Sequence, residues 1–174
     1  GAYNTAVGYQ AGYTNTTGSP VTFVGYQAGK QATGSYLTGI GYNALNNPVT
    51  GSNSVAVGTN TLASLTSGNS NTAVGDYALQ ANTTASNNTA VGYQAGYSQT
   101  GGYNTAIGGY ALQGSNTPAN NTGTYNTAVG YTALNPNTSG NNNSAFGTAA
   151  FQSNTTGSSG TVSYTHLTLP TIYS

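Results

Sequence analysis

Besides tyrosine, only three side chains in this sequence could work as acids, bases or charged groups: Lys30, Asp76 and His166. A lysine can act as a nucleophile, an aspartate as a base and a histidine as either acid or base, but each needs a second reactive group held beside it. Lys30 and Asp76 fall in different parts of the chain, and the histidine stands alone near the end. A carboxylate pair, a Ser/His/Asp set or a Cys/His set cannot be assembled, so we expect no catalysis.

The same scarcity argues against bound metals, cofactors and nucleic acid. The chain has no Cys and no Met, so a tetrahedral zinc site or an oxygen-ligated calcium site lacks its ligands. Charged residues make up 1% of 174 residues, against roughly 25% in ordinary soluble domains. A basic track for phosphates is missing, and no long apolar run predicts insertion into a membrane. We therefore expect no cofactor, no metal and no nucleic-acid partner.

A motif centred on glycine recurs nine times and organises the chain. Successive glycines are 17, 16, 17, 17, 17, 16, 22 and 17 residues apart. The anchor glycines are Gly8, Gly25, Gly41, Gly58, Gly75, Gly92, Gly108, Gly130 and Gly147. Before each stands a β-branched or aromatic residue: Val7, Val24, Ile40, Val57, Val74, Val91, Ile107, Val129 and Phe146.

The consensus is Asn-Thr-Ala-Val-Gly-Tyr-x-Ala followed by turn-forming residues, and it predicts β-strands and bends. Thr-Ala-Val is a short β-type run, and helix-forming Glu, Lys and Arg are almost absent. One unit is too short for a pair of helices, so it fits one coil of a β-solenoid. The predicted fold is all-β: a single-chain solenoid, a parallel β-roll of about nine coils of 16–17 residues.

Strand alternation places the residue before the glycine and the Thr two positions earlier on one side, and the intervening Ala on the other. We expect the Val/Ile column to lie inside the coil and the anchor glycines to lie at bends. A charged residue at Val74 should then unfold the rod. Stacking in register would place like charges about 4.8 Å apart, which explains why charged residues are so rare.

Neutral residues can form ladders in such a stack, and tyrosines follow several anchors directly. We expect this column to form a partly buried ladder that stiffens the coil, or else a surface for self-association or for sugar binding. Its members are Tyr9, Tyr26, Tyr42, Tyr93 and Tyr131, with Tyr77 and Tyr110 one position later.

We expect a solenoid domain over residues 1–156 and a tail over 157–174. The 22-residue interval indicates an insertion near residues 114–121, where Pro118 disfavours a regular strand. The tail contains His166 and does not match the repeat. It is either a genuine capping or joining segment or a non-native, adaptor-derived sequence.

The runs Asn53-Ser54-Val55-Ala56-Val57-Gly58 and Asn71-Thr72-Ala73-Val74-Gly75 resemble the head repeats of YadA-like trimeric autotransporter adhesins. They are also similar to repeats in bacteriophage and environmental tail fibres. The resemblance spans about residues 1–151 and implies a left-handed β-roll, one repeat per coil, with three chains forming a rod on a cell or virion surface. Within these 174 residues we expect no coiled-coil stalk, neck motif or membrane anchor.

These observations favour an extracellular, non-enzymatic fibre module whose partner is itself, with Ala-lined strand faces packed between chains. One alternative is a filament joined end to end, because no obvious polar cap precedes the first unit. Another is binding of a glycan or host-surface receptor through the Tyr column. A Thr column could instead form an ice-binding face, but such faces usually need a doubled array, and no Thr stands two residues before these threonines. We also expect them to be interior if they share a side with Val. The column is Thr5, Thr22, Thr38, Thr72, Thr89, Thr105 and Thr127.

Overall fold

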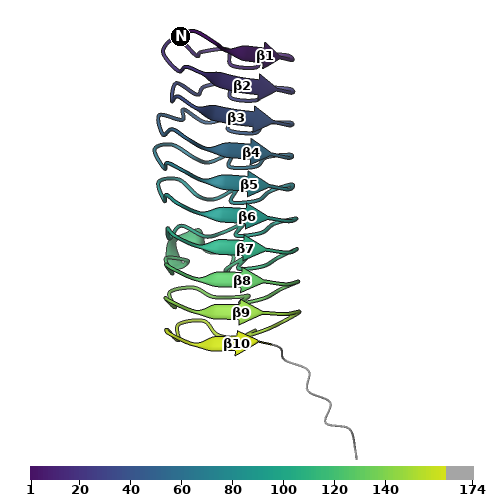
Figure 1. The fold of residues 1–174 in the computed structure, drawn as a ribbon, viewed down its shortest axis with the longest axis vertical. Helices are drawn as coiled ribbons and strands as arrows, with labels where there is room; N and C mark the ends of the chain where they lie inside the picture. The colour runs from purple at the N-terminus through teal and green to yellow at the C-terminus, as the bar shows by residue number, and fades with distance from the viewer. Residues whose placement is uncertain (164–174) are drawn as a thin grey trace, which may run out of the picture.

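The computed structural model describes residues 1–163 and shows a β-solenoid in which ten parallel strands form one sheet in sequence order. Figure 1 shows the strands stacked one above another along a straight rod. The strands are β1 (Thr5–Val7), β2 (Val21–Val24), β3 (Leu37–Ile40), β4 (Val55–Val57), β5 (Thr72–Val74), β6 (Thr89–Val91), β7 (Thr105–Ile107), β8 (Thr127–Val129), β9 (Ser144–Phe146) and β10 (Thr161–Ser163). One 3-10 helix, η1 (Pro118–Asn120), lies between β7 and β8.

The repeat stacks in register, so each strand residue pairs with the residue at the same position of the next coil. Thr72 pairs with Thr89, and Val74 pairs with Val91. The bends stack as well: the Gly25 amide donates to the Val7 carbonyl oxygen at 2.8 Å, and the Gly29 amide donates to the Ala44 carbonyl oxygen at 2.8 Å. Hydrogen bonds between neighbouring coils therefore extend around the coil and are not confined to the sheet.

The interior of the coil is built from small residues, and the prediction that the Val/Ile column lies inside is wrong. From the second to the ninth coil, the central residue of each strand is buried. The residue three positions after the anchor, which is Ala except for Thr61, and the Leu that often follows it are buried as well. Val74 and Val91 are each 37% exposed, whereas Ala73 and Ala90 are 0% exposed. Side chains do alternate along each strand, but Ala points into the coil and Val or Ile points outward. The interior of such a short coil has room for the strand Ala to pack against Leu from the bend, and it has no room for a column of Val as well. The nine corrected residues are Val7, Val24, Ile40, Val57, Val74, Val91, Ile107, Val129 and Phe146.

A ladder of buried asparagines closes one side of the interior. The backbone amide of Asn88 donates to Asn71 Oδ1 at 3.0 Å, and the amide of Asn104 donates to Asn88 Oδ1 at 2.9 Å. Asn126 and Asn143 continue the same pattern at 2.9 and 3.0 Å. The consensus Asn is therefore a structural residue: its side chain satisfies backbone groups that would otherwise be buried without partners.

All nine anchor glycines lie at a bend just after their strand, with φ between +119° and +136°. A Cβ added at Gly75 would lie 2.6 Å from the carbonyl oxygen of Gly92 in the next coil. Both the positive φ and this close approach exclude other residues.

The second coil carries a large residue at the small strand position, and its neighbours compensate. Phe23 is fully buried where most units have Ala. A Cβ on Gly29 would lie 2.4 Å from its ring, and a Cβ on Gly12 or Gly39 would lie 3.1 Å from it. These three glycines come from the preceding, the same and the following coil, so the ring uses space left free by three coils.

The 22-residue interval leaves the regular path as a side loop that includes η1 (Figure 1). Asn121 closes this loop: its Oδ1 accepts the Ser115 amide at 3.0 Å, and its Nδ2 donates to the Ser115 carbonyl oxygen at 2.8 Å. Within the stack, Gln99 Nε2 reaches two coils further and donates to the Asn137 carbonyl oxygen at 3.1 Å. β7 and β8 still pair in register, with Thr105 opposite Thr127, so the insertion does not disturb their stacking.

The repeat array extends past the predicted boundary at residue 156. β10 pairs with β9 in register, with Thr161 opposite Ser144 and Val162 opposite Ala145. Residues 157–163 thus belong to the solenoid and not to a separate tail. His166 and the two interpretations of the final segment lie outside the described residues.

Because Ala and not Val faces the interior, a charge at the Ala position should destabilise the fold more than a charge at the Val position. Ala73→Asp places an unpaired carboxylate in a dry interior, which costs several kcal/mol, and should unfold or disassemble the stack. Val74→Asp places the carboxylate in water and should lower the free energy of unfolding by less than about 1 kcal/mol. Thermal and urea unfolding followed by circular dichroism measure both, and equal damage from the two changes would contradict the assignment.

Phe23 offers a second test of the interior. Phe23→Ala restores the consensus residue but leaves a cavity bounded by three glycines, so it should destabilise the protein by about 3–5 kcal/mol. Val24→Ala, on the outer side of the same strand, is the matched control and should cost less than about 1 kcal/mol. Urea titration of both variants gives the comparison, and the assignment fails if Phe23→Ala is as stable as the control.

Candidate functional surfaces

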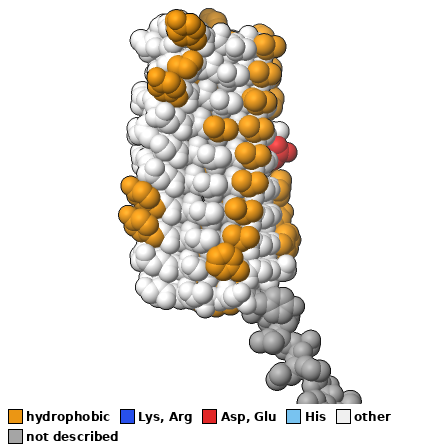
Figure 2. All heavy atoms as spheres, viewed as in Figure 1, with side chains coloured by type: hydrophobic (Ala, Val, Ile, Leu, Met, Phe, Trp, Pro, Cys, Tyr) orange, Lys and Arg blue, Asp and Glu red, His pale blue; other side chains and the backbone are white. Residues whose placement is uncertain are grey.

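The outward side of the sheet carries two parallel columns of side chains, which we call the Thr/Val face. One column is the Val/Ile column, and Figure 2 shows it as a line of hydrophobic side chains along the rod. The other column, two residues earlier on each strand, is Thr in eight of ten coils: Thr5, Thr22, Thr38, Thr72, Thr89, Thr105, Thr127 and Thr161, with Val55 and Ser144 in the remaining two. Neither charged side chain of the described residues lies on a strand.

The bend after the strands carries a line of aromatic rings, which we call the Tyr ridge. In the first three coils Tyr26 stacks between Tyr9 and Tyr42, with ring centroids 5.2 Å apart on both sides. Further along, the rings meet edge to face: Tyr93 and Tyr110 at 5.3 Å, Tyr110 and Tyr131 at 5.8 Å, and Tyr77 and Tyr93 at 6.2 Å. The ridge therefore has a parallel-stacked part and a herringbone part, interrupted by Thr59 and Asp76.

The tyrosines that directly follow an anchor glycine are 44–62% exposed: Tyr9, Tyr26, Tyr42, Tyr93 and Tyr131. Each ring thus keeps about half of its surface in water while its neighbours along the rod restrict its position. Aromatic side chains held this way present large contact areas with polar tips.

Beside the herringbone rings runs a ladder of amides that the sequence did not reveal. Gln94 Nε2 donates to the Tyr93 hydroxyl oxygen at 3.1 Å, and Gln113 Nε2 donates to Gln94 Oε1 at 2.7 Å. Asn135 Nδ2 then donates to Gln113 Oε1 at 3.2 Å. Gln94 lies two residues after its anchor glycine, whereas Gln113 and Asn135 lie five residues after theirs, so no common spacing in the sequence indicated the ladder.

The herringbone arrangement perturbs one phenol. Desolvation raises the pKa of Tyr110 above its usual value of 10.0, and the neighbouring Tyr93 and Tyr131 phenols and a hydrogen bond to Tyr93 raise it further. The neutral form of this ring is therefore favoured in the folded rod.

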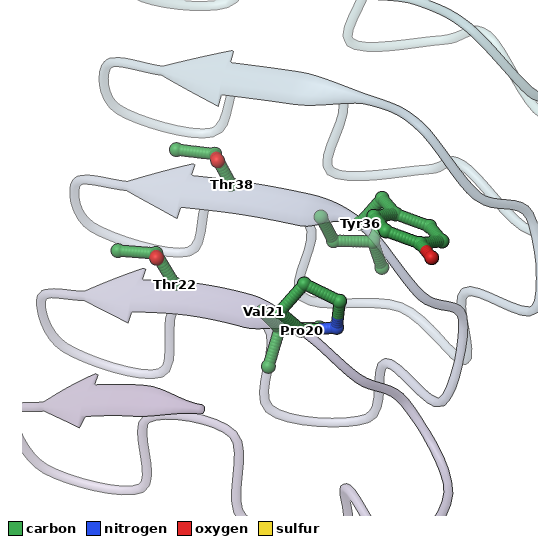
Figure 3. Close-up of a pocket in the computed structure, with 6 residues that line it drawn as sticks. Pro20, Val21, Thr22, Tyr36 and Thr38 are labelled. Carbon is green, nitrogen blue, oxygen red and sulfur yellow. The ribbon is translucent and has the colours of Figure 1, made fainter. Parts of the chain in front are cut away.

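A hollow of about 260 Å³ lies on the sheet face at β2 and β3. Figure 3 shows Tyr36 and Pro20 at one side, with Thr22 and Thr38 on neighbouring strands. Leu37 and Val21 complete the lining. The hollow has no charged group and is smaller than the roughly 300–1,000 Å³ usual for small-molecule sites, so it does not form a candidate active site.

Within residues 1–163, the side chains available for acid–base chemistry besides tyrosine are Lys30 and Asp76. Asp76 Oδ1 accepts the Thr59 amide at 2.7 Å, and Lys30 lies in another coil. That part of the chain has no group of three or more His, Cys, Asp or Glu placed to hold a metal ion. It also has no helix long and apolar enough to cross a bilayer.

Comparison with models of known families, with curated proteins and with solved structures found no match to this chain. The candidate surfaces therefore rest on their geometry.

The raised pKa of Tyr110 predicts how stability depends on pH. Because the folded-state pKa lies above the unfolded one, ionisation favours the unfolded chain, and stability is lost as the pH rises through about 10 and above. From about pH 5 to 9 few charges change, so the melting temperature of a His166→Gln variant should stay almost constant.

Calorimetry across this range, with Tyr110→Phe made in the same background, checks both parts. Tyr110→Phe should show a smaller alkaline decline, because it removes the perturbed phenol. A melting temperature that falls steeply between pH 9 and pH 5, or an alkaline decline unaffected by Tyr110→Phe, would contradict this account.

Proposed function

We propose that this chain is a non-catalytic structural module, a rigid rod that associates with its own copies through the Tyr ridge. The observation that carries the proposal is that partly exposed rings contact one another from coil to coil in two runs, one from Tyr9 to Tyr42 and one from Tyr77 to Tyr131. Tyrosine is enriched at protein interfaces because it combines contact area with a hydrogen-bonding tip.

The stacking of the ridge also lowers the cost of association. A flexible side chain loses about 0.5–1.5 kcal/mol when an interface immobilises it. Tyr26 is already held between Tyr9 and Tyr42, and Tyr110 between Tyr93 and Tyr131. Rings ordered before contact have less freedom to lose, which favours lateral association over many coils.

The Ala-lined face that the sequence suggested for packing between chains cannot serve, because these alanines are buried inside each coil. The Tyr ridge takes that role in the proposal. A rod of this kind fits the shaft of a cell-surface adhesin or a tail fibre, in keeping with the resemblance to YadA-like and tail-fibre repeats. An extracellular or virion-surface location is part of the same proposal.

A second candidate is binding of a neutral glycan along the herringbone part of the ridge. The amide ladder of Gln94, Gln113 and Asn135 favours it, because aromatic rings beside amides supply both apolar contact and hydrogen bonds to hydroxyl groups. Titration with neutral oligosaccharides, followed by tyrosine fluorescence, tests it. Gln113→Ala should weaken binding if the amides take part.

The test of self-association compares the Tyr93→Ser/Tyr110→Ser double variant with Tyr3→Ser. Tyr3 is 90% exposed and lies outside the ridge, so it is the matched control. Truncating a hot-spot tyrosine at an interface costs about 2 kcal/mol or more, so the dissociation constant of the double variant should rise by roughly thirtyfold.

Sedimentation velocity and negative-stain microscopy provide the readout. Discrete rods of several chains that become single chains only in the double variant support the proposal, and three chains per rod would match the adhesin-like arrangement. Long unbranched fibres unaffected by the tyrosine changes would favour end-to-end polymerisation instead. A wild-type protein that stays monomeric at every concentration tested would overturn the proposal.

A further inference from the structure

The Thr/Val face repeats in two dimensions. Along the rod, the columns repeat once per coil, about 4.8 Å for hydrogen-bonded strands, and across the face they are two residues apart, about 6.6 Å. The pairing is in register from β1 to β10, so the same two positions recur on all ten strands. Both spacings are of the same order as the distances at which water oxygens repeat in hexagonal ice.

The threonine hydroxyl groups on this face have no hydrogen-bond partner among the described residues. In residues 1–163, no hydroxyl of the eight threonines on the face makes a hydrogen bond to another residue. Threonines elsewhere behave differently: Thr66 Oγ1 donates to the Thr83 carbonyl oxygen at 2.9 Å, and Thr138 Oγ1 donates to the Thr155 carbonyl oxygen at 2.8 Å. Threonines off the face thus hold coils together, whereas those on the face are free to bind water.

The face is also rigid and uncharged. Thr, Val and Ile are β-branched, so their χ1 angles are restricted and their methyl and hydroxyl groups hold fixed positions. Lys30 and Asp76 lie on bends away from the strands. No tightly hydrated charge therefore interrupts the water over the columns.

We propose that the Thr/Val face binds ice. The free threonine hydroxyls hydrogen-bond water molecules at lattice-like positions, and the methyl groups of Thr and Val restrict the orientation of the water between them. The water layer ordered by this face can then join the surface lattice of an ice crystal, so that the protein adsorbs to the ice. Ice growing between bound rods must curve outward, which lowers its growth temperature.

A second protein chain fits this face less well than a lattice does. The columns present nearly the same residues on every coil, so a partner shifted by one coil meets almost the same surface and its register is weakly specified. A crystal tolerates such shifts, because its own surface is periodic. Self-association through the Tyr ridge leaves this face open, so the present inference does not depend on that proposal.

The full-length chain should therefore show thermal hysteresis, a gap between the melting and growth temperatures of a single ice crystal, together with faceted crystal growth. Thr89→Tyr places a bulky ring in the middle of the array and should remove most of the hysteresis. Thr84→Tyr, the same change at an exposed threonine off the strands, is the matched control and should leave it unchanged. Equal circular dichroism spectra and melting temperatures establish that both variants fold.

Val55→Thr gives a gain-of-function test that loss of folding cannot imitate. Val55 is the position where the Thr column is interrupted in the middle of the rod. The two side chains have nearly the same shape, so the change adds a hydroxyl without altering the packing, and hysteresis should increase.

Absence of hysteresis and of inhibited ice recrystallisation in the wild-type chain would overturn the proposal. So would hysteresis that survives Thr89→Tyr in a folded variant. A chain without ice activity whose oligomers dissociate on Thr89→Tyr would show that a second copy covers the face, which also overturns it. The Tyr93→Ser/Tyr110→Ser variant should keep its ice activity whatever its oligomeric state, so the two proposals fail independently.

Discussion

Hydrogen bonds between each coil and the coil directly beneath it determine the rest of this structure. They run through the sheet, the bends and the buried asparagine side chains, and they bring every residue close to its counterpart one unit away. Any side chain that repels its own copy is then penalised once per coil. A sequence with 1% charged residues is the consequence, since only neutral side chains can be stacked in this way without cost.

The same constraint gives the outer surface its character. Because like lies beside like, each sequence position becomes a stripe with one kind of chemistry along the rod. The Thr/Val face and the Tyr ridge are two such stripes, separated by the anchor glycine. The two proposed roles need different surfaces: association between chains uses the protruding rings of the Tyr ridge, and adsorption to ice uses the regular Thr/Val face. Because the bend at the anchor glycine separates these surfaces, one molecule can have both.

Sequence spacing was sufficient to predict the solenoid and its strands, because the Thr-Ala-Val-Gly run recurs at nearly constant intervals. Alternation also placed Thr and Val together on one side. It could not decide which side faces inward: Val is the larger apolar residue and is a natural choice for a core. The decision depends on the width of the coil, which is set by Ala and Leu after the bend and by the asparagine ladder, and three-dimensional packing alone reveals it.

Two further features were hidden for related reasons. β10 carries Thr161 one repeat length after Ser144, but Tyr164 stands in the sequence where the next anchor glycine would fall, so a search based on that glycine passes over the unit. Exposure of the threonines follows from the inversion of the Val column, since both share one side of the strand. An ice-binding face was disfavoured from the sequence because its threonines were expected to be interior and because no second Thr column stands two residues before them.

Phe23 shows how far the coils are interchangeable. Its ring occupies space left by glycines in three consecutive coils, whereas other units bury small residues that contact similar neighbours. In the gene, duplication or loss of a unit in the middle of the array would change the length of the rod by one step and preserve its contacts. Recombination through the first three units would separate the ring from its glycines, so this block has to be inherited whole while the remainder of the rod is free to vary in length.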